Sequence, residues 1–263
     1  MTQHILTTSH HFLSPPQKVV GGLEKRNSVM TADEKKTIAF HEAGHAIAGW
    51  FLEHADPLLK VTIIPRSGGA LGFAQYLPKE VQLFTREALV DRMCMALGGR
   101  VAEELTFGRI TTGAIDDLDK VTQLAYALTT VYGMNPRVGQ ISFPRREEQQ
   151  FDKPYSEATA RVIDEEVKIL VDMCYARTKE LLALHADKLK KVADLLLERE
   201  TISQVDLALL AGERPFPISA GIKEYLSAQF DDANKVVPPK ESASKTENEG
   251  EVVDLPVAAT KAL

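Results

Sequence analysis

The 263-residue sequence contains only two cysteines, Cys94 and Cys174, and both fall in segments with helical periodicity. Two thiols in this setting do not make a disulfide framework, and they favour a reducing compartment. No run of about 18 apolar residues occurs, so no segment is expected to span a bilayer. The first twenty residues lack a basic start followed by an apolar stretch, so they are not expected to be a secretory signal.

Positive charge is not in excess either. The chain has 31 basic and 37 acidic side chains, a formal net charge of -6, and its lysines and arginines form no long stripe. This charge balance gives no electrostatic footprint for nucleic acid, so no nucleic-acid partner is expected. A GxxxxGK[ST] phosphate-binding loop is also missing, so no nucleotide site is recognisable.

What the sequence does have is a hydrophobic fraction of 44%, which at this length is enough to bury a core. Composition divides the chain into three regions. Residues 1–27 are an irregular lead-in, residues 28–212 carry helical periodicity, and residues 213–263 accumulate Pro, Lys, Glu, Ser and Asn. We expect one globular domain over residues 28–212, followed by a largely disordered tail.

Helical patterns dominate the central region. A capping-box pattern at Thr31 and Glu34 opens a first helix that should continue to Trp50. Five further helices are expected: one capped by Thr85, one from Gly113 to near Gly133, and three over residues 156–184, 187–200 and 203–210. The helix over residues 156–184 is long enough to form a helical hairpin with the next one.

A minor β element is expected between the first two helices. Residues 60–65 are β-branched and short, and a glycine-rich turn separates them from residues 71–77. Two such runs around a turn predict a small β-hairpin. The predicted fold class is therefore mainly α with a small hairpin or sheet.

Residues 41 to 45 read His-Glu-Ala-Gly-His, an HExxH motif inside the first expected helix. At 3.6 residues per turn, His41 and His45 lie about 40° apart around the helix, so both imidazoles can point at one metal ion. Glu42 lies beside the pair, too far round to be an easy third ligand. Zinc lowers the pKa of water that it binds, and a neighbouring carboxylate can accept the proton during attack on a peptide carbonyl. The motif therefore indicates peptide hydrolysis.

Two glycines interrupt the same helix. Gly44 and Gly49 each cost about 1 kcal/mol relative to alanine in a helix interior, so something should offset the cost. Either a side chain at Gly44 would crowd the metal or an approaching backbone, or the helix packs closely on a neighbour. The sequence favours neither explanation.

A hydrolytic zinc site needs a third protein ligand. Asp117 falls on the apolar stripe of its expected helix, whereas Asp116 falls on a polar side, where it can pair with Lys120. A carboxylate on a buried stripe needs a partner, and a metal ion is one candidate. Three possibilities stay open: Asp117 is the ligand, Asp117 is a helix cap, or Glu103 or Glu104 is the ligand.

Several separated blocks carry a family resemblance. They read GGLEKRNSVMTADEKKTIAFHEAGHAIAGW, LLKVTIIPRSGGALGFAQYLP, MCMALGGRVAEELTFGRITTGAIDDLDKVTQLAYAL and YSEATARVIDEEV, and they lie between about Val20 and Leu210. In this order they resemble the peptidase domain of FtsH-like AAA proteases, with the greatest likeness to the mitochondrial m-AAA, paraplegin-type branch. The resemblance implies a mostly helical zinc metalloendopeptidase domain over residues 28–212.

The resemblance also implies roles for individual residues. In that family the TGAxxD block supplies an aspartate as the third zinc ligand, and residues 113–117 match it here, with Asp117 at the ligand position. His41 and His45 match the two histidine ligands, and Glu42 matches the catalytic base. An extended substrate would be held along an edge strand in the region of residues 71–77.

Further implications concern the assembly and its location. The family forms six-subunit rings, and the m-AAA branch is associated with the mitochondrial inner membrane. Its members also carry an ATPase module and a membrane segment that this sequence does not contain, so the expected substrates are unfolded or membrane-extracted polypeptides. Two alternatives stay open: a non-catalytic or regulatory subunit of a mixed AAA protease ring, and a helical interaction module in which HEAGH is accidental.

Overall fold

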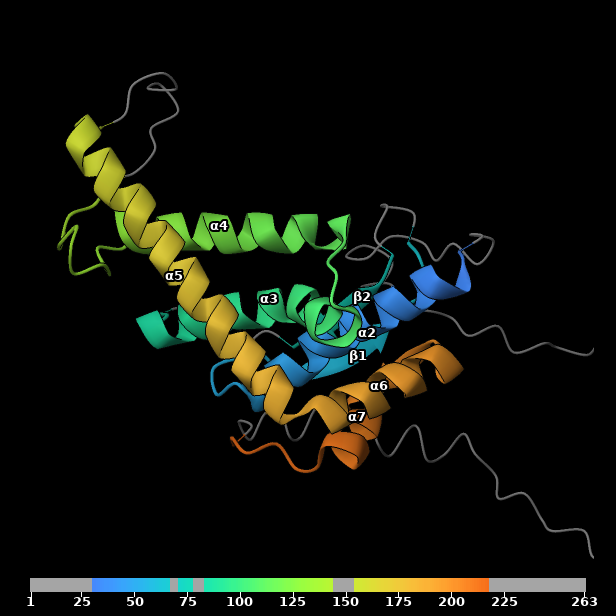
Figure 1. The fold of residues 1–263 in the computed structure, drawn as a ribbon. Helices are drawn as coiled ribbons and strands as arrows, with labels where there is room; N and C mark the ends of the chain where they lie inside the picture. Colours follow the sequence, from blue (N-terminus) through green and yellow to red (C-terminus); the bar gives the residue numbers. More distant parts are fainter. Residues whose placement is uncertain (1–29, 67–70, 78–82, 144–153, 218–263) are drawn as a thin grey trace, which may run out of the picture. The chain divides into compact units, whose positions relative to one another are not determined.

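The structure is a computed structural model that describes residues 30–66, 71–77, 83–143 and 154–217 (Figure 1). Within these residues the chain forms six α-helices, one short 3-10 helix and three strands. The helices are α2 (Ala32–Phe51), α3 (Arg86–Phe107), η1 (Thr112–Ala114), α4 (Ile115–Thr130), α5 (Glu157–Leu184), α6 (Ala186–Arg199) and α7 (Gln204–Ala211). The strands are β1 (Leu58–Thr62), β2 (Phe73–Tyr76) and β3 (Thr201–Ser203). The expected class, mainly α with a small β element, is confirmed.

Two of the three expected regions lie largely outside the described residues. These are the lead-in over residues 1–27 and most of the tail over residues 213–263, so the division of the chain stays a prediction. Within the described ranges, no helix combines the length and the apolar character that crossing a bilayer requires.

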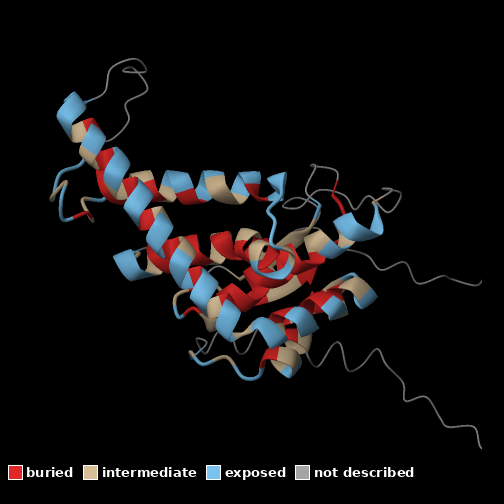
Figure 2. Cartoon of the chain, viewed as in Figure 1, coloured by how far each residue is buried: buried red, intermediate tan, exposed pale blue. Residues whose placement is uncertain are grey.

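Helix α2 runs through the interior of the domain. It begins with the expected capping box, in which the Thr31 hydroxyl accepts a hydrogen bond from the Glu34 amide and the Glu34 carboxylate accepts one from the Thr31 amide. Every residue from Ala39 to Trp50 is buried, because α3 and α6 both pack on this helix (Figure 2). A helix buried on all sides is normally apolar throughout. The histidines and the glutamate of the HExxH motif therefore lie in an interior position that needs partners.

Helices α2 and α3 touch through their backbones. A Cβ atom added to Gly44 would lie 2.3 Å from the carbonyl oxygen of Gly98, and one added to Gly98 would lie 2.7 Å from the carbonyl oxygen of Gly44. Close packing on a neighbouring helix therefore explains Gly44. Gly49 is less constrained, since its nearest neighbour would be the flexible Met95 thioether at 3.1 Å.

The three strands form one antiparallel sheet in the order β2-β1-β3. The pairing of β1 with β2 confirms the expected hairpin. Strand β3 was not predicted, because its three residues are too few to show an alternating pattern and the strand that it pairs with, β1, is distant in sequence. Its central residue Ile202 pairs with Val61 and is fully buried.

The expected helical hairpin of α5 and α6 is wrong. Only His185 separates the two helices, whereas antiparallel helices are joined by about two to five residues. The chain therefore changes direction without folding back on itself (Figure 1). Helix α5 packs mainly against α3 and α4, whereas α6 packs mainly against α2.

Substitutions at the two glycines of α2 test the backbone contact. Gly44→Ala should lower the free energy of unfolding by about 1–3 kcal/mol, because overpacking costs this much and the neighbour is a rigid carbonyl. Gly49→Ala is the matched control in the same helix, where alanine gains about 1 kcal/mol of helix propensity and only a flexible side chain must move. Urea unfolding measures both. Equal stability of the two variants would contradict the contact.

Candidate metal centre

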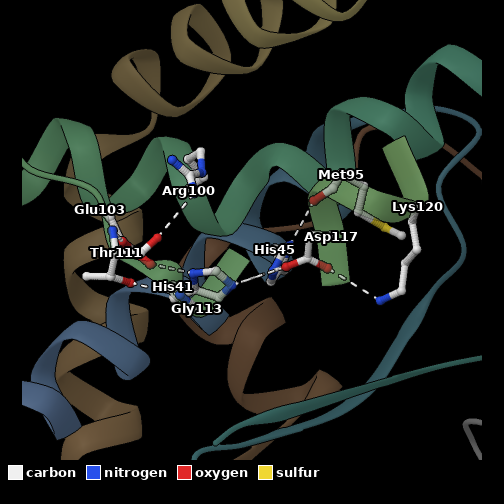
Figure 3. A network of polar contacts seen from close by, with 9 residues as sticks. All are labelled: His41, His45, Met95, Arg100, Glu103, Thr111, Gly113, Asp117 and Lys120. Carbon is white, nitrogen blue, oxygen red and sulfur yellow. Dashed lines mark hydrogen bonds and ion pairs between the residues drawn. The ribbon is translucent and has the colours of Figure 1, made fainter. Parts of the chain in front are cut away.

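Three side chains from two helices bring one ligand atom each to a common point (Figure 3). The Nε2 atoms of His41 and His45, both on α2, are 3.0 Å apart. On α4, the Asp117 Oδ2 atom lies 3.3 Å from Nε2 of His41 and 3.2 Å from Nε2 of His45. All three side chains are largely buried, with exposed fractions of 11%, 11% and 18%. The structure thus brings together the three residues that the motif and the helical phase indicated.

The start of α4 shows why Asp117 reaches this point. The Thr111 hydroxyl accepts a hydrogen bond from the Gly113 amide and fixes the short η1 turn, after which α4 begins at once. No side chain caps α4, because the residue at the cap position is Ala114. Asp117 lies in the first turn and directs its carboxylate to the histidines. The structure therefore does not show Asp117 as a helix cap.

Each imidazole is held from behind by α3. Nδ1 of His41 lies 2.7 Å from Glu103 Oε1, and Nδ1 of His45 lies 2.9 Å from the carbonyl oxygen of Met95. A carbonyl oxygen only accepts, so His45 must donate from Nδ1, which leaves the lone pair of Nε2 free in the neutral ring. The other oxygen of Glu103 accepts a hydrogen bond from the Thr111 amide at 2.7 Å. Glu103 thus connects His41 to the loop that precedes Asp117.

The other two acidic candidates for the third ligand, Glu103 and Glu104, do not face the Nε2 atoms of the histidines. Glu103 contacts the rear nitrogen of His41, and Glu104 accepts hydrogen bonds from a tyrosine and a lysine of α5. Neither belongs to the cluster of three. The expected ion pair of Asp116 with Lys120 is also replaced, because the Lys120 ammonium lies 3.5 Å from Asp117 Oδ1. Residues three and four apart lie on the same helix face, so Lys120 can reach either Asp117 or Asp116.

The charges of the cluster stabilise one another. Burial alone would raise the pKa of the Asp117 carboxyl, but hydrogen bonds with His41 and His45 hold it well below its usual range. Burial likewise opposes a charged His41, yet Asp117 and Glu103 together raise the pKa of His41 to about 9. Without a metal ion, His41 is therefore protonated at neutral pH, and a cation must displace that proton to bind.

Glu42 lies beside the cluster without contacting either imidazole at hydrogen-bond distance. Burial raises its pKa, although the nearby rings of His45 and His41 act in the opposite direction. A Cβ atom on Gly72, just before β2, would lie 2.3 Å from Glu42 Oε1. The carboxylate of Glu42 therefore packs against the backbone at Gly72. Its raised pKa makes it a stronger base than an ordinary glutamate.

Sequence reasoning missed several residues that shape this centre. The contact of Glu103 with Nδ1 of His41 and that of the Met95 carbonyl with Nδ1 of His45 both depend on packing between α2 and α3. Gly99 is required for space, since a Cβ atom there would lie 2.3 Å from Nε2 of His41. The paired glycines 98 and 99 inside a helix were the one available signal, because each costs about 1 kcal/mol relative to alanine.

Comparison with known proteins agrees with this geometry. Residues 28–210 match Peptidase family M41. The mouse mitochondrial inner membrane m-AAA protease component AFG3L2 is 58% identical over 218 residues, which cover 82% of this chain and 27% of the relative. The ATP-dependent zinc metalloprotease FtsH of Rhodothermus marinus is 52% identical over 203 residues, which cover 76% of this chain and 29% of the relative.

A yeast relative extends the match. The mitochondrial inner membrane m-AAA protease component YTA10 of Saccharomyces cerevisiae is 47% identical over 238 residues, or 90% of this chain and 31% of the relative. The chain thus spans less than a third of the length of these three relatives. The resemblance to FtsH-like proteases is confirmed, and the chain belongs to peptidase family M41.

Proposed function

We propose that the chain is a zinc metalloendopeptidase in which His41, His45 and Asp117 hold the metal ion and Glu42 is the catalytic base. The observation that carries the proposal is the convergence of three ligand atoms within 3.0 to 3.3 Å of one another, beside a buried carboxylate. A chance HExxH string would not place an aspartate from another helix at the same point. The alternative of an accidental motif in a helical interaction module is therefore disfavoured.

The donor set fits zinc. Two imidazole nitrogens and one carboxylate oxygen are ordinary zinc ligands, and three protein ligands leave one position open, as in hydrolytic sites. Tetrahedral ligands at about 2.0–2.1 Å from zinc lie about 3.3 Å from one another. The distances between the three ligand atoms are close to this value. The partners behind the imidazoles are a carboxylate and a carbonyl, the usual supports of zinc-binding histidines.

The chain's own residues would divide the chemistry between them. Zinc, when bound, supplies Lewis-acid chemistry that polarises the scissile carbonyl and makes water more acidic. Glu42 accepts a proton from the attacking water as the water oxygen adds to the carbonyl carbon. It then donates that proton to the leaving nitrogen as the C–N bond breaks. The raised pKa of Glu42 suits both directions of transfer.

The sheet offers a place for an extended substrate. Strand β2 is at the edge of the sheet, and within the described residues it pairs only with β1. A polypeptide adding to that edge would bind through its main chain, so binding would tolerate many sequences but would require an unfolded segment. Gly72 directly precedes this strand, and its backbone packs against the Glu42 carboxylate. We therefore propose unfolded or membrane-extracted polypeptides as substrates.

The family relatives support proposals about assembly and location. Their names place AFG3L2 and YTA10 in protease complexes of the mitochondrial inner membrane. We propose the same location for this chain and a ring, six-membered as the family resemblance implies, of identical or mixed subunits. The unfolding step would come from an ATPase module in that assembly. A non-catalytic subunit remains the alternative, and a test of cleavage distinguishes it.

Glu42→Gln tests the function directly. The variant should retain zinc, because Glu42 is not among the three ligands, and should lose peptide cleavage by about 10²–10⁴-fold, the usual contribution of a general base. Zinc content and cleavage of casein, an unfolded substrate, are measured on one purified sample. Full activity in the variant would refute the assigned role. A zinc-loaded wild-type chain without activity would favour the non-catalytic alternative.

Glu103→Gln tests the support behind His41. Loss of the carboxylate should weaken zinc binding by about 10–100-fold, as is typical for partners of metal-binding histidines. Glu104→Gln is the control, because it removes the neighbouring carboxylate of the same helix, which faces α5 instead. Competition with a chromophoric chelator measures both affinities. If the two variants bound zinc equally well, Glu103 would have no positioning role.

The pKa of His41, about 9, predicts how zinc binding depends on pH. Below that pH zinc must displace the His41 proton, so its affinity should rise about tenfold per pH unit between pH 7 and 8.5. Chelator competition at several pH values measures the slope. A zinc affinity that is already constant above pH 7 would show that His41 binds no proton in the metal-free protein.

A further inference from the structure

Tyr76, at the end of β2, has a hydroxyl group that the proposed chemistry has not used. The hydroxyl oxygen is closed off from solvent and has no hydrogen-bond partner among the described residues. Most buried hydroxyl groups are paired, because an unpaired one loses its bonds to water without replacement. An unpaired buried donor on the strand that follows the Glu42 contact suggests a partner that arrives with the substrate.

The strand directs Tyr76 towards the helix that carries the HExxH motif. Side chains alternate along a strand, so position 76 shares a face with position 72. Both positions contact α2. Gly72 packs against the Glu42 carboxylate, and a Cβ atom added to Gly49 would lie 3.6 Å from the Tyr76 ring. Gly49 is one turn beyond His45 on α2. The tyrosine therefore lies on the same side of β2 as the proposed base.

The charges nearby keep this hydroxyl a donor. Burial raises the pKa of Tyr76, and the carboxylates of Glu42, Asp117 and Asp56 raise it further. The phenol is therefore protonated at neutral pH.

We propose that the Tyr76 hydroxyl donates a hydrogen bond to the carbonyl oxygen of the scissile peptide as negative charge develops on it. The inference rests on the proposed peptidase function and adds a catalytic residue to it. Addition of water to the carbonyl carbon moves the electron pair of the C=O bond onto the oxygen. A fixed donor that has no partner in the free protein stabilises this charge without first breaking another bond. The hydrogen bond weakens again when the carbonyl re-forms and the amine leaves.

Tyr76→Phe removes only the hydroxyl oxygen, and the full chain serves for every measurement. The turnover number kcat on casein should fall about a hundredfold, the usual effect of losing one such donor, while KM and zinc content change little. The melting temperature should stay the same or rise, because the lost group had no partner. A phosphinic peptide, whose anionic oxygen mimics the charged carbonyl oxygen, should bind at least tenfold more weakly.

Tyr175→Phe is the matched control. Its hydroxyl donates to Glu104 at 2.6 Å, so its loss should lower the melting temperature and leave kcat unchanged. Unchanged kcat and unchanged phosphinic peptide binding in Tyr76→Phe would overturn the inference while leaving the peptidase function intact. A lower melting temperature with proportional loss of zinc would show a structural role and overturn it as well. Wild-type protein that binds neither zinc nor the phosphinic peptide would overturn the proposed function itself, and the inference with it.

Discussion

The close approach of α2 and α3 is the constraint on which the rest of the structure depends. Gly44 and Gly98 place one backbone directly on the other, with no side chain between them. At this spacing α3 can offer a main-chain carbonyl and the Glu103 carboxylate to the rear nitrogens of the two imidazoles. A wider spacing would break both contacts and free the rings to rotate. Two residues without functional groups thus determine where the Nε2 atoms of the two histidines point.

The pKa values of the three carboxylates around the centre are shifted in different directions. Burial favours the neutral acid in each case, but Asp117 and Glu103 both contact an imidazole nitrogen, and the pKa of each is lowered. Glu42 contacts none at hydrogen-bond distance, and its pKa is raised. The environment therefore favours the charged form of two carboxylates and the protonated form of the third, a division typical of acid–base sites.

Local patterns in the sequence predict much of the fold and the two histidines, and they make Asp117 one of the candidates for the third member of the cluster. The capping box at Thr31, the HExxH spacing and the apolar stripe that includes Asp117 each depend on residues within one helix, where geometry is regular. The failures depend on contacts between distant segments. The sequence does not show that β3 pairs with β1, that α5 and α6 diverge, or that Glu103 lies behind a histidine 62 positions earlier. Such contacts exist only after the helices pack.

Strand β2 combines two roles that a pleated strand can carry at once. Its main-chain groups point sideways along an edge at which no described residue pairs, while the chain at Gly72 and the ring of Tyr76 face α2. A substrate paired with that edge is therefore fixed in register relative to Glu42. A slip by two residues moves the scissile bond by about 6.6 Å, beyond the reach of any one catalytic group. Under the proposed function, register and main-chain pairing would then select the cleaved bond, whatever the side chains of the unfolded segment.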